Sequence, residues 1–185
     1  MKKLSLYVLL VLLFGGNTIA ETEDRNLKLD QLFEQLKKSN NVSIALEIEI
    51  KIWDIWLTHP TQEGLTQSLA KGSDLMSKGE LDSAYKIFST IINSAPAWAE
   101  GWNKRATVLY LMGRYQESLD DIEEVLKHES RHFGALSGQG LVQTALENYE
   151  KAIKSYEAVQ KIYPSIESAK VMIPQLKKLI KDNAI

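Results

Sequence analysis

Residues 99–130 read AEGWNKRATVLYLMGRYQESLDDIEEVLKHES, and the same pattern recurs before and after them at a spacing of about 34 residues. Small residues lie at Gly72, Ala106 and Gly140, one in each copy. Further sets match in size or in turn-forming tendency: Leu81, Tyr115 and Tyr149; Ala84, Ser118 and Ala152; Phe88, Ile122 and Tyr156; Pro96, Ser130 and Pro164; and Gly79 and Gly113, with Glu147 as the exception. Self-similarity at a period of roughly 20–50 residues indicates a solenoid of stacked units.

Each copy is predicted to be a helix–turn–helix unit in an all-α chain. The units span 63–96, 97–130 and 131–164, with helices expected near 63–78, 81–94, 97–112, 115–128, 131–146 and 149–162. Gly79 and Gly113 fall where a helix ends in a left-handed residue. The third turn has no glycine, and Asn148 is expected to take that conformation there. The residues of the proline set, Pro96, Ser130 and Pro164, close the second helix of each unit.

Packing explains the size of the repeated residues. The small set Ala84, Ser118 and Ala152 is expected where the two helices of a unit cross closely, because a larger side chain there would cost roughly 1–3 kcal/mol. Trp102 takes the large apolar position early in the first helix of the second unit. Ser68, at the matching position, is neither large nor apolar, so residues 63–96 are the poorest match to the repeat.

The segments on either side of the repeats are predicted to be helical caps. Residues 165–185 hold one amphipathic helix near 166–182, which Pro174 should kink or split and which covers the last apolar face. Residues 21–62 are predicted to form a helical hairpin stacked before the first unit. Residues 46–52 alternate as a strand does, but a lone strand would have no partner in a helical chain, and a helix is favoured.

Residues 1–20 have the pattern of an export signal. Lys2 and Lys3 precede the apolar run 4–14, and Ala20 ends a small-residue cleavage site. The apolar run is about half of the roughly 20 residues that a membrane-spanning helix needs. Cleavage after Ala20 is therefore expected, which would make the mature chain periplasmic or secreted.

Composition excludes several classes of function. The 185 residues carry a formal net charge of −2 and no cysteine. Without a basic block, neither nucleic acid nor, beyond the export signal, a membrane surface is an expected partner. The absence of cysteine removes disulfides, a lipoprotein anchor and a thiol nucleophile. No G-x-S-x-G motif or phosphate-binding glycine loop follows a strand, so no catalytic activity, metal or cofactor is expected.

One string of residues could suggest a metal site. Residues 128–132, from His128 to His132, read H-E-x-x-H, the zinc motif of metalloproteases. The repeat places them across the turn between two helices, where the two histidines would not stand one helical turn apart. A zinc-dependent hydrolase is therefore a remote alternative. Arg105, inside a helix on a side that packs on its neighbours, is expected to form a structural ion pair with Asp120 or Asp121.

The repeated residues resemble the tetratricopeptide repeat (TPR) family over 65–164, and the chain looks like a small exported TPR protein of Gram-negative bacteria. The best match is the second unit, in which Trp102, Ala106, Gly113 and Ser118 hold the family's positions. The resemblance implies a right-handed superhelix whose concave groove is lined by the first helix of each unit. Its implied groove positions are Thr66, Leu69, Ser73 and Met76; Glu100, Asn103, Thr107 and Tyr110; Gly134, Ser137, Leu141 and Thr144.

The resemblance also implies a partner. Ser73, Asn103, Thr107, Tyr110, Ser137 and Leu141 are the candidate residues for binding a peptide in a groove with few charges. Some chaperone-binding relatives grip a C-terminal carboxylate with Lys, Arg and Asn. The matching sites here include Leu69, Ser73, Gly134 and Gly138, which cannot supply that clamp, so a carboxylate tail is not the expected ligand.

The sequence therefore predicts a monomeric, non-catalytic scaffold that binds an unidentified protein or peptide through its concave groove. The alternative is a structural or assembly subunit of an envelope complex that uses the convex face or the caps. A fold alone does not decide between them.

Overall fold

The computed structural model describes residues 23–183, which form helices and contain no strand in that range. A helix over residues 23–38 precedes α2 (Val42–Leu57). Seven more helices follow in chain order: α3 (Glu63–Ser77), α4 (Leu81–Ser94), α5 (Ala99–Leu111), α6 (Tyr115–His128), α7 (Phe133–Ala145), α8 (Tyr149–Ile162) and α9 (Glu167–Asn183). The export signal predicted for residues 1–20 lies outside the described residues. Within 23–183, no helix has the length and apolar character that crossing a membrane requires.

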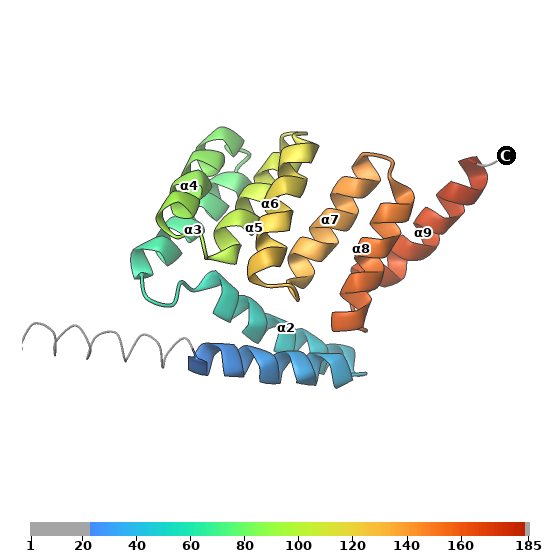
Figure 1. Ribbon diagram of the computed structural model, residues 1–185, viewed down its shortest axis with the longest axis horizontal. Helices are drawn as coiled ribbons and strands as arrows, with labels where there is room; N and C mark the ends of the chain where they lie inside the picture. Colours follow the sequence, from blue (N-terminus) through green and yellow to red (C-terminus); the bar gives the residue numbers. More distant parts are fainter. Residues whose placement is uncertain (1–22, 184–185) are drawn as a thin grey trace, which may run out of the picture.

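The repeat helices pair as the sequence period predicts. α3 packs on α4, α5 on α6 and α7 on α8, and the three pairs stand side by side with α9 after the last (Figure 1). All six helices agree with the predicted bounds within two residues at each end. The second helix of each pair carries an apolar stripe on one side, as helices that cover a core do. The all-α solenoid predicted from the sequence is confirmed.

Small residues bring the two helices of a unit close together. A Cβ atom at Gly72 would lie 2.6 Å from Phe88 Cε1, and one at Gly140 would lie 2.6 Å from Tyr156 Cζ. In the second unit, the Ser118 hydroxyl donates to the Ala106 carbonyl over 2.8 Å. The small set Ala84, Ser118 and Ala152 is buried throughout. The repeated small residues are thus explained by helix–helix contact, as predicted.

The three turns within the units each have the same type of backbone hydrogen bond, and the third turn differs from the prediction. The amides of Glu80, Arg114 and Asn148 each donate to the carbonyl five residues earlier, at Leu75, Leu109 and Gln143. Gly79 and Gly113 take φ +79° and +74°, but in the third turn the left-handed residue is Glu147, at φ +58°. Asn148 takes φ −84° at the start of α8, so the expectation that it is left-handed was wrong. The register of the repeat decided the conformation, and the side chain did not.

Residues 46–52 are helical, so the choice of helix over strand is confirmed. Glu49, the residue that breaks the apolar face of this helix, accepts hydrogen bonds from Trp53 Nε1 over 3.2 Å and from the Tyr163 hydroxyl over 3.0 Å. α9 is one continuous helix through Pro174, so the chain is not split there. Ala169 and Leu176 of α9 are buried against α8, which makes α9 the C-terminal cap.

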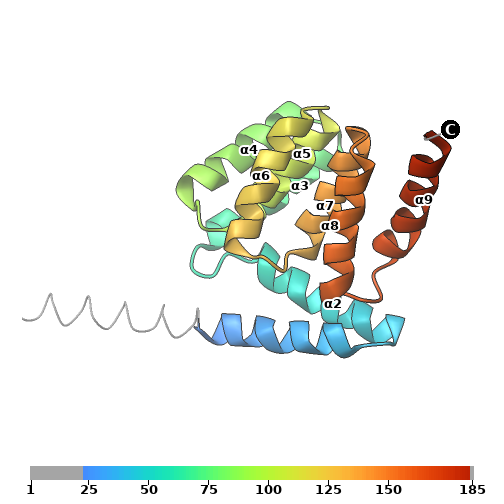
Figure 2. The same cartoon turned by 45° about the vertical axis from the view of Figure 1, so that its right-hand side comes forward.

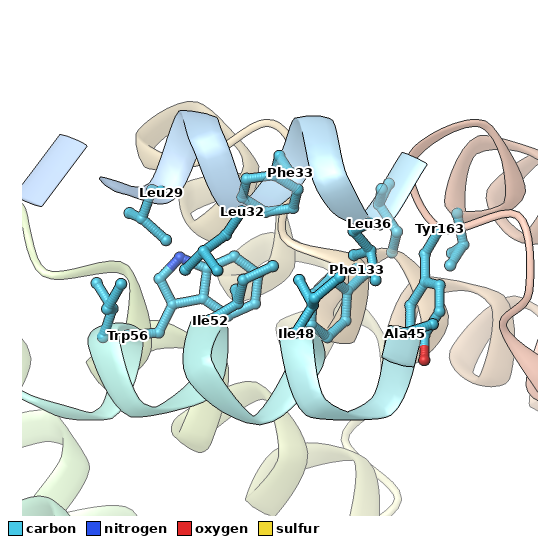
Figure 3. Packing of buried hydrophobic residues seen from close by; sticks show 13 residues of the cluster. Leu29, Leu32, Phe33, Leu36, Ala45, Ile48, Ile52, Trp56, Phe133 and Tyr163 are labelled. Carbon is cyan, nitrogen blue, oxygen red and sulfur yellow. The ribbon is translucent and has the colours of Figure 1, made fainter. Parts of the chain in front are cut away.

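The N-terminal hairpin does not lie where the sequence suggested. Helix 23–38 and α2 run across one end of the repeat helices instead of stacking in front of the first unit (Figures 1 and 2). Residues of both helices form one core with Phe133, Leu136, Val159 and Tyr163 (Figure 3). Arg131 Nη1 also contacts Asp30 Oδ1 over 2.6 Å. The hairpin's apolar face was predicted, but its partner is the edge of the third unit.

Candidate functional site

The candidate site begins with the spacing of small and polar residues on two neighbouring helices. Asn103, Ala106, Thr107 and Tyr110 follow each other along one face of α5 at helical spacing. The facing side of α7 carries glycine and alanine at 134, 135 and 138. Because these side chains are short, they leave space between the two helices, which belong to adjacent repeats.

That space is a pocket of about 70 Å³ with no charged residue in its lining. The lining residues are Asn103, Ala106, Thr107, Tyr110, Ser118, Ile122, Gly134, Ala135, Gly138, Leu141 and Val142. Four candidate residues from the sequence therefore meet in one place: Asn103, Thr107, Tyr110 and Leu141. Ser73, on α3, and Ser137, on α7, are half-buried and do not line this pocket.

A buried polar cluster lies beside the pocket. Glu100 is 1% exposed and accepts hydrogen bonds from Asn103 Nδ2, at 3.1 and 3.2 Å, and from His132 Nε2, at 3.1 Å. Lys104 Nζ lies 3.5 Å from the same carboxylate. Burial alone raises the pKa of Glu100, but the His132 hydrogen bond, the Lys104 charge and the Asn103 hydrogen bond together hold that pKa below its ordinary value.

His132 has both ring nitrogens in use. Nδ1 accepts the Ala135 amide over 3.1 Å and so caps the start of α7, which leaves Nε2 as the donor to Glu100. The ring is fully buried and stacks on Trp56 at 3.9 Å with an interplanar angle of 8°. The role of His132 is therefore to join α5, α7 and the hairpin.

The H-E-x-x-H string does not have the geometry of a zinc motif. His128 is the last residue of α6 and exposed, whereas His132 is the buried cap of α7. The turn between them breaks the helical geometry that the motif needs, as the repeat register predicted. Among residues 23–183, no group of three or more His, Cys, Asp or Glu side chains is placed to hold a metal ion.

The hairpin covers one end of the surface that was expected to be open. A Cβ atom at Gly134 would lie 2.6 Å from Trp53 Cη2, and Trp56 covers His132 above Glu100. Glu100 and Gly134, which the family resemblance placed on the groove, are therefore under α2. No sequence pattern indicated this, because the apolar stripe of α2 predicts a buried face without predicting its partner. What stays open is the stretch around Thr107, Tyr110 and Leu141.

The ion pair expected at Arg105 is confirmed, with Asp121 as the partner. Nε and Nη2 of Arg105 each contact a carboxylate oxygen of Asp121 over 2.7 Å. These hydrogen bonds raise the pKa of Arg105. The guanidinium also lies over the Trp102 ring, 5.1 Å from its centroid. Asp120 is exposed and accepts a hydrogen bond from Gln116 instead. Arg105 therefore holds α5 to α6 and is absent from the pocket lining.

Comparison with known proteins decides the family. A tetratricopeptide repeat family model matches residues 135–166, most of the third unit. A TPR repeat-containing protein of Rhizobium etli is 32% identical over 157 residues, covering 84% of this chain and 76% of the relative. The chain belongs to the tetratricopeptide repeat family. The match of this TPR chain is longer than the three units together, so it extends beyond the repeats.

Solved TPR domains share the fold at low sequence identity. The Sgt2 TPR domain from Aspergillus fumigatus superimposes with a TM-score of 0.63 at 18% identity, over 66% of this chain and 83% of that domain. The first TPR domain of Spaghetti (RPAP3), bound to an HSP90 peptide, gives 0.61 at 19% identity, over 63% and 93%. At these identities the likeness concerns the fold alone.

Proposed function

We propose that this TPR protein is a monomeric, non-catalytic scaffold that binds a protein or peptide in the concave groove formed by α3, α5 and α7. One observation carries the proposal. Asn103, Thr107, Tyr110 and Leu141 come from two repeats and line a single apolar pocket with polar groups at its wall. Peptide and ligand sites commonly combine apolar walls with a few placed polar groups.

The fold supports this use of the pocket. The RPAP3 domain with the same fold is described as bound to an HSP90 peptide, SRMEEVD. That peptide ends in acidic residues and a carboxylate, whereas the pocket of this chain has no charged lining residue. We therefore propose a neutral, partly apolar peptide as the partner, with weak dependence of the affinity on salt.

The proposed location is the periplasm or the extracellular space. Support comes from the export-signal pattern of residues 1–20, with cleavage after Ala20. N-terminal sequencing of the purified chain tests it: a first residue of Glu21 would agree, and an intact Met1 would contradict it.

A matched pair of threonine variants tests the groove. Thr107 on α5 and Thr90 on α4 both donate their hydroxyl to the carbonyl four residues earlier, over 3.0 Å in each case, and both are exposed. Only Thr107 lines the pocket. In crosslinking capture from native cells, Thr107→Glu should lose the partner that the wild type holds, because it places a charge at an apolar site. Thr90→Glu should retain it.

The second candidate function is that of an assembly subunit which docks through the hairpin. The observation in its favour is a row of exposed apolar side chains along α2, at Val42, Leu46 and Ile50, with 64%, 52% and 60% exposure. Capture that survives Thr107→Glu but is lost in Leu46→Glu, with the fold intact by circular dichroism, would favour this function over the groove.

A further inference from the structure

The orientation of the Asn103 side chain follows from its neighbours. Both atoms that Nδ2 approaches are carboxylate oxygens of Glu100, at 3.1 and 3.2 Å. A reversed amide would set its oxygen against those oxygens, so the NH₂ group must face Glu100. The carbonyl Oδ1 then points away from Glu100, and no donor among residues 23–183 bonds to it. Asn103 is 8% exposed and lines the pocket.

The hydroxyl protons of two other residues in the pocket wall, Thr107 and Ser118, are donated to backbone carbonyls. Thr107 Oγ1 donates to the Asn103 carbonyl over 3.0 Å, and Ser118 Oγ donates to the Ala106 carbonyl over 2.8 Å. Besides the hydroxyls of exposed Thr107 and half-buried Tyr110, which can also accept, the wall offers the amide oxygen Asn103 Oδ1 amid apolar surface. Asn103 Oδ1 is not among the fully buried polar atoms that lack a partner, so it keeps contact with solvent, and a ligand N–H can replace the water that bonds to it.

The size of the pocket limits what can enter it. Its volume of about 70 Å³ is roughly half that of a cavity of about 150 Å³ that accommodates benzene. Roughly three or four carbon atoms would fill it by this comparison. Gly138 keeps the space open, since a Cβ atom there would meet only Ile122 Cδ1, at 3.8 Å.

We infer that this pocket anchors one compact aliphatic side chain of the bound peptide while Asn103 Oδ1 accepts a hydrogen bond from the adjacent peptide N–H. The inference rests on the proposed function. Glu100 is a positioning residue, because it turns the donor end of the Asn103 amide away from the ligand. The same orientation works against a carboxylate ligand, which would need the donor end.

Two small amides test the anchor directly. N-isobutylacetamide carries a branched four-carbon group next to an N–H, and N-isobutyl-N-methylacetamide lacks that N–H. In ¹H–¹⁵N NMR titrations of the purified chain, the first should shift the resonances of Ala106, Gly138 and Leu141 and the side-chain amide of Asn103. The second should bind roughly 3- to 10-fold more weakly, as the loss of one hydrogen bond predicts. Equal affinity would overturn the role of Asn103, and no shift at these residues would overturn the pocket.

Variants distinguish the contribution of the apolar pocket wall to binding from that of the Asn103 acceptor. Gly138→Leu should fill the pocket and abolish the shifts, whereas Gly138→Ala should keep them, and thermal melts check that both variants fold. Glu100→Gln should keep binding but lose most of the preference for N-isobutylacetamide, because a glutamine amide no longer fixes the orientation of Asn103. The ratio of the affinities for the two amides would stay unchanged if Glu100 acted on stability alone. An unchanged ratio in Glu100→Gln would therefore overturn the positioning role of Glu100.

Failure of the anchor can be distinguished from failure of the proposed function. A partner lost in Thr107→Glu but retained in Gly138→Leu would contradict the anchor and leave groove binding in place. A partner retained by both variants would contradict groove binding, and the two amides would still decide whether the pocket takes an aliphatic amide.

Discussion

Glu147 occupies a backbone conformation that suits glycine. Its φ of +58° matches the +79° and +74° of Gly79 and Gly113 in the equivalent turns. A side chain in this region costs about 1 kcal/mol relative to glycine. Glu147→Gly is therefore expected to raise the free energy of unfolding by about 1 kcal/mol, measured from urea unfolding. Glu147→Ala is the control and should give no gain, since alanine keeps the strain; equal gains in both variants would contradict the explanation.

Glu100 should make stability depend on pH. Its pKa in the folded chain is lowered by its buried partners, so its contribution is present above about pH 4.5 and is lost as the pH falls through the folded pKa. The polar groups facing it are the His132 ring on the α7 side and the charged Lys104 on α5, while α2 presents the uncharged rings of Trp53 and Trp56.

The measurement is urea unfolding at pH 6 and pH 3.5 for the wild type and Glu100→Gln. At pH 6 the variant should be about 2 kcal/mol less stable, because a hydrogen-bonded buried charge is lost. The difference should shrink at pH 3.5, because this pH lies below the ordinary carboxyl pKa of 4.5, where a lowered folded pKa contributes less to the free energy of unfolding. A difference that stays constant between the two pH values would show that Glu100 contributes only by its shape.

At this scale, the sequence predicted repeated residues better than unique ones. Gly113 and Ser118 could be placed because each has a counterpart in a neighbouring unit whose similar size implies a common contact. The Glu100–His132 pair has no counterpart in the other units, and its burial depends on Trp56, which belongs to the hairpin and not to the repeats. No local pattern indicates such a contact, so Glu100 was expected on an open groove.

At the scale of elements, α7 carries two glycines in different surroundings: Gly134 lies close to Trp53, and Gly138 borders the pocket. A Cβ atom at Gly134 would lie 2.6 and 2.9 Å from ring atoms of Trp53, whereas one at Gly138 has a single neighbour at 3.8 Å. Gly138→Ala should therefore stabilise the chain by about 1 kcal/mol through helix propensity. Gly134→Ala should cost about 1–3 kcal/mol, because the Trp53 ring must move.

Thermal unfolding and tryptophan fluorescence check the pair of glycine variants. In Gly134→Ala the emission should shift to longer wavelength as Trp53 becomes more exposed, and in Gly138→Ala it should not change. Equal stability of the two variants would contradict the contact between α2 and α7.

The helices themselves were predictable, and the position of the hairpin was not. Turn residues and a fixed period give the bounds of α3 to α8, because each unit repeats the same local contacts. An amphipathic helix such as α2 shows which side is buried but not what buries it. Its partner cluster includes Phe133, the first residue of α7, and Tyr163, which directly follows α8.

At the scale of the whole molecule, the hairpin changes how the solenoid holds together. In a simple solenoid each unit contacts only its neighbours, and stability is close to a sum of units and interfaces. Here the hairpin joins residues far apart in the chain: Asp30 contacts Arg131, Glu49 contacts Tyr163, and Trp98 Nε1 donates to the Trp56 carbonyl over 2.9 Å. The hairpin should therefore couple the second and third units, and loss of its packing should loosen helices distant in sequence.

Ile52→Ala tests this coupling. Ile52 is fully buried in the cluster that contains Phe133, Leu136 and Val159, so the truncation should cost about 2–5 kcal/mol. Hydrogen exchange should become faster in α7 and α8 as well as in α2, because the same core protects all three. Ile91→Ala is the matched control: Ile91 is 1% exposed in the core of the first unit, and its loss should speed exchange in α3 and α4 while α8 stays near the wild type. If Ile52→Ala loosened α2 alone, the hairpin would be an appendage of an independent solenoid, and the covered end of the groove would open without cost to the repeats.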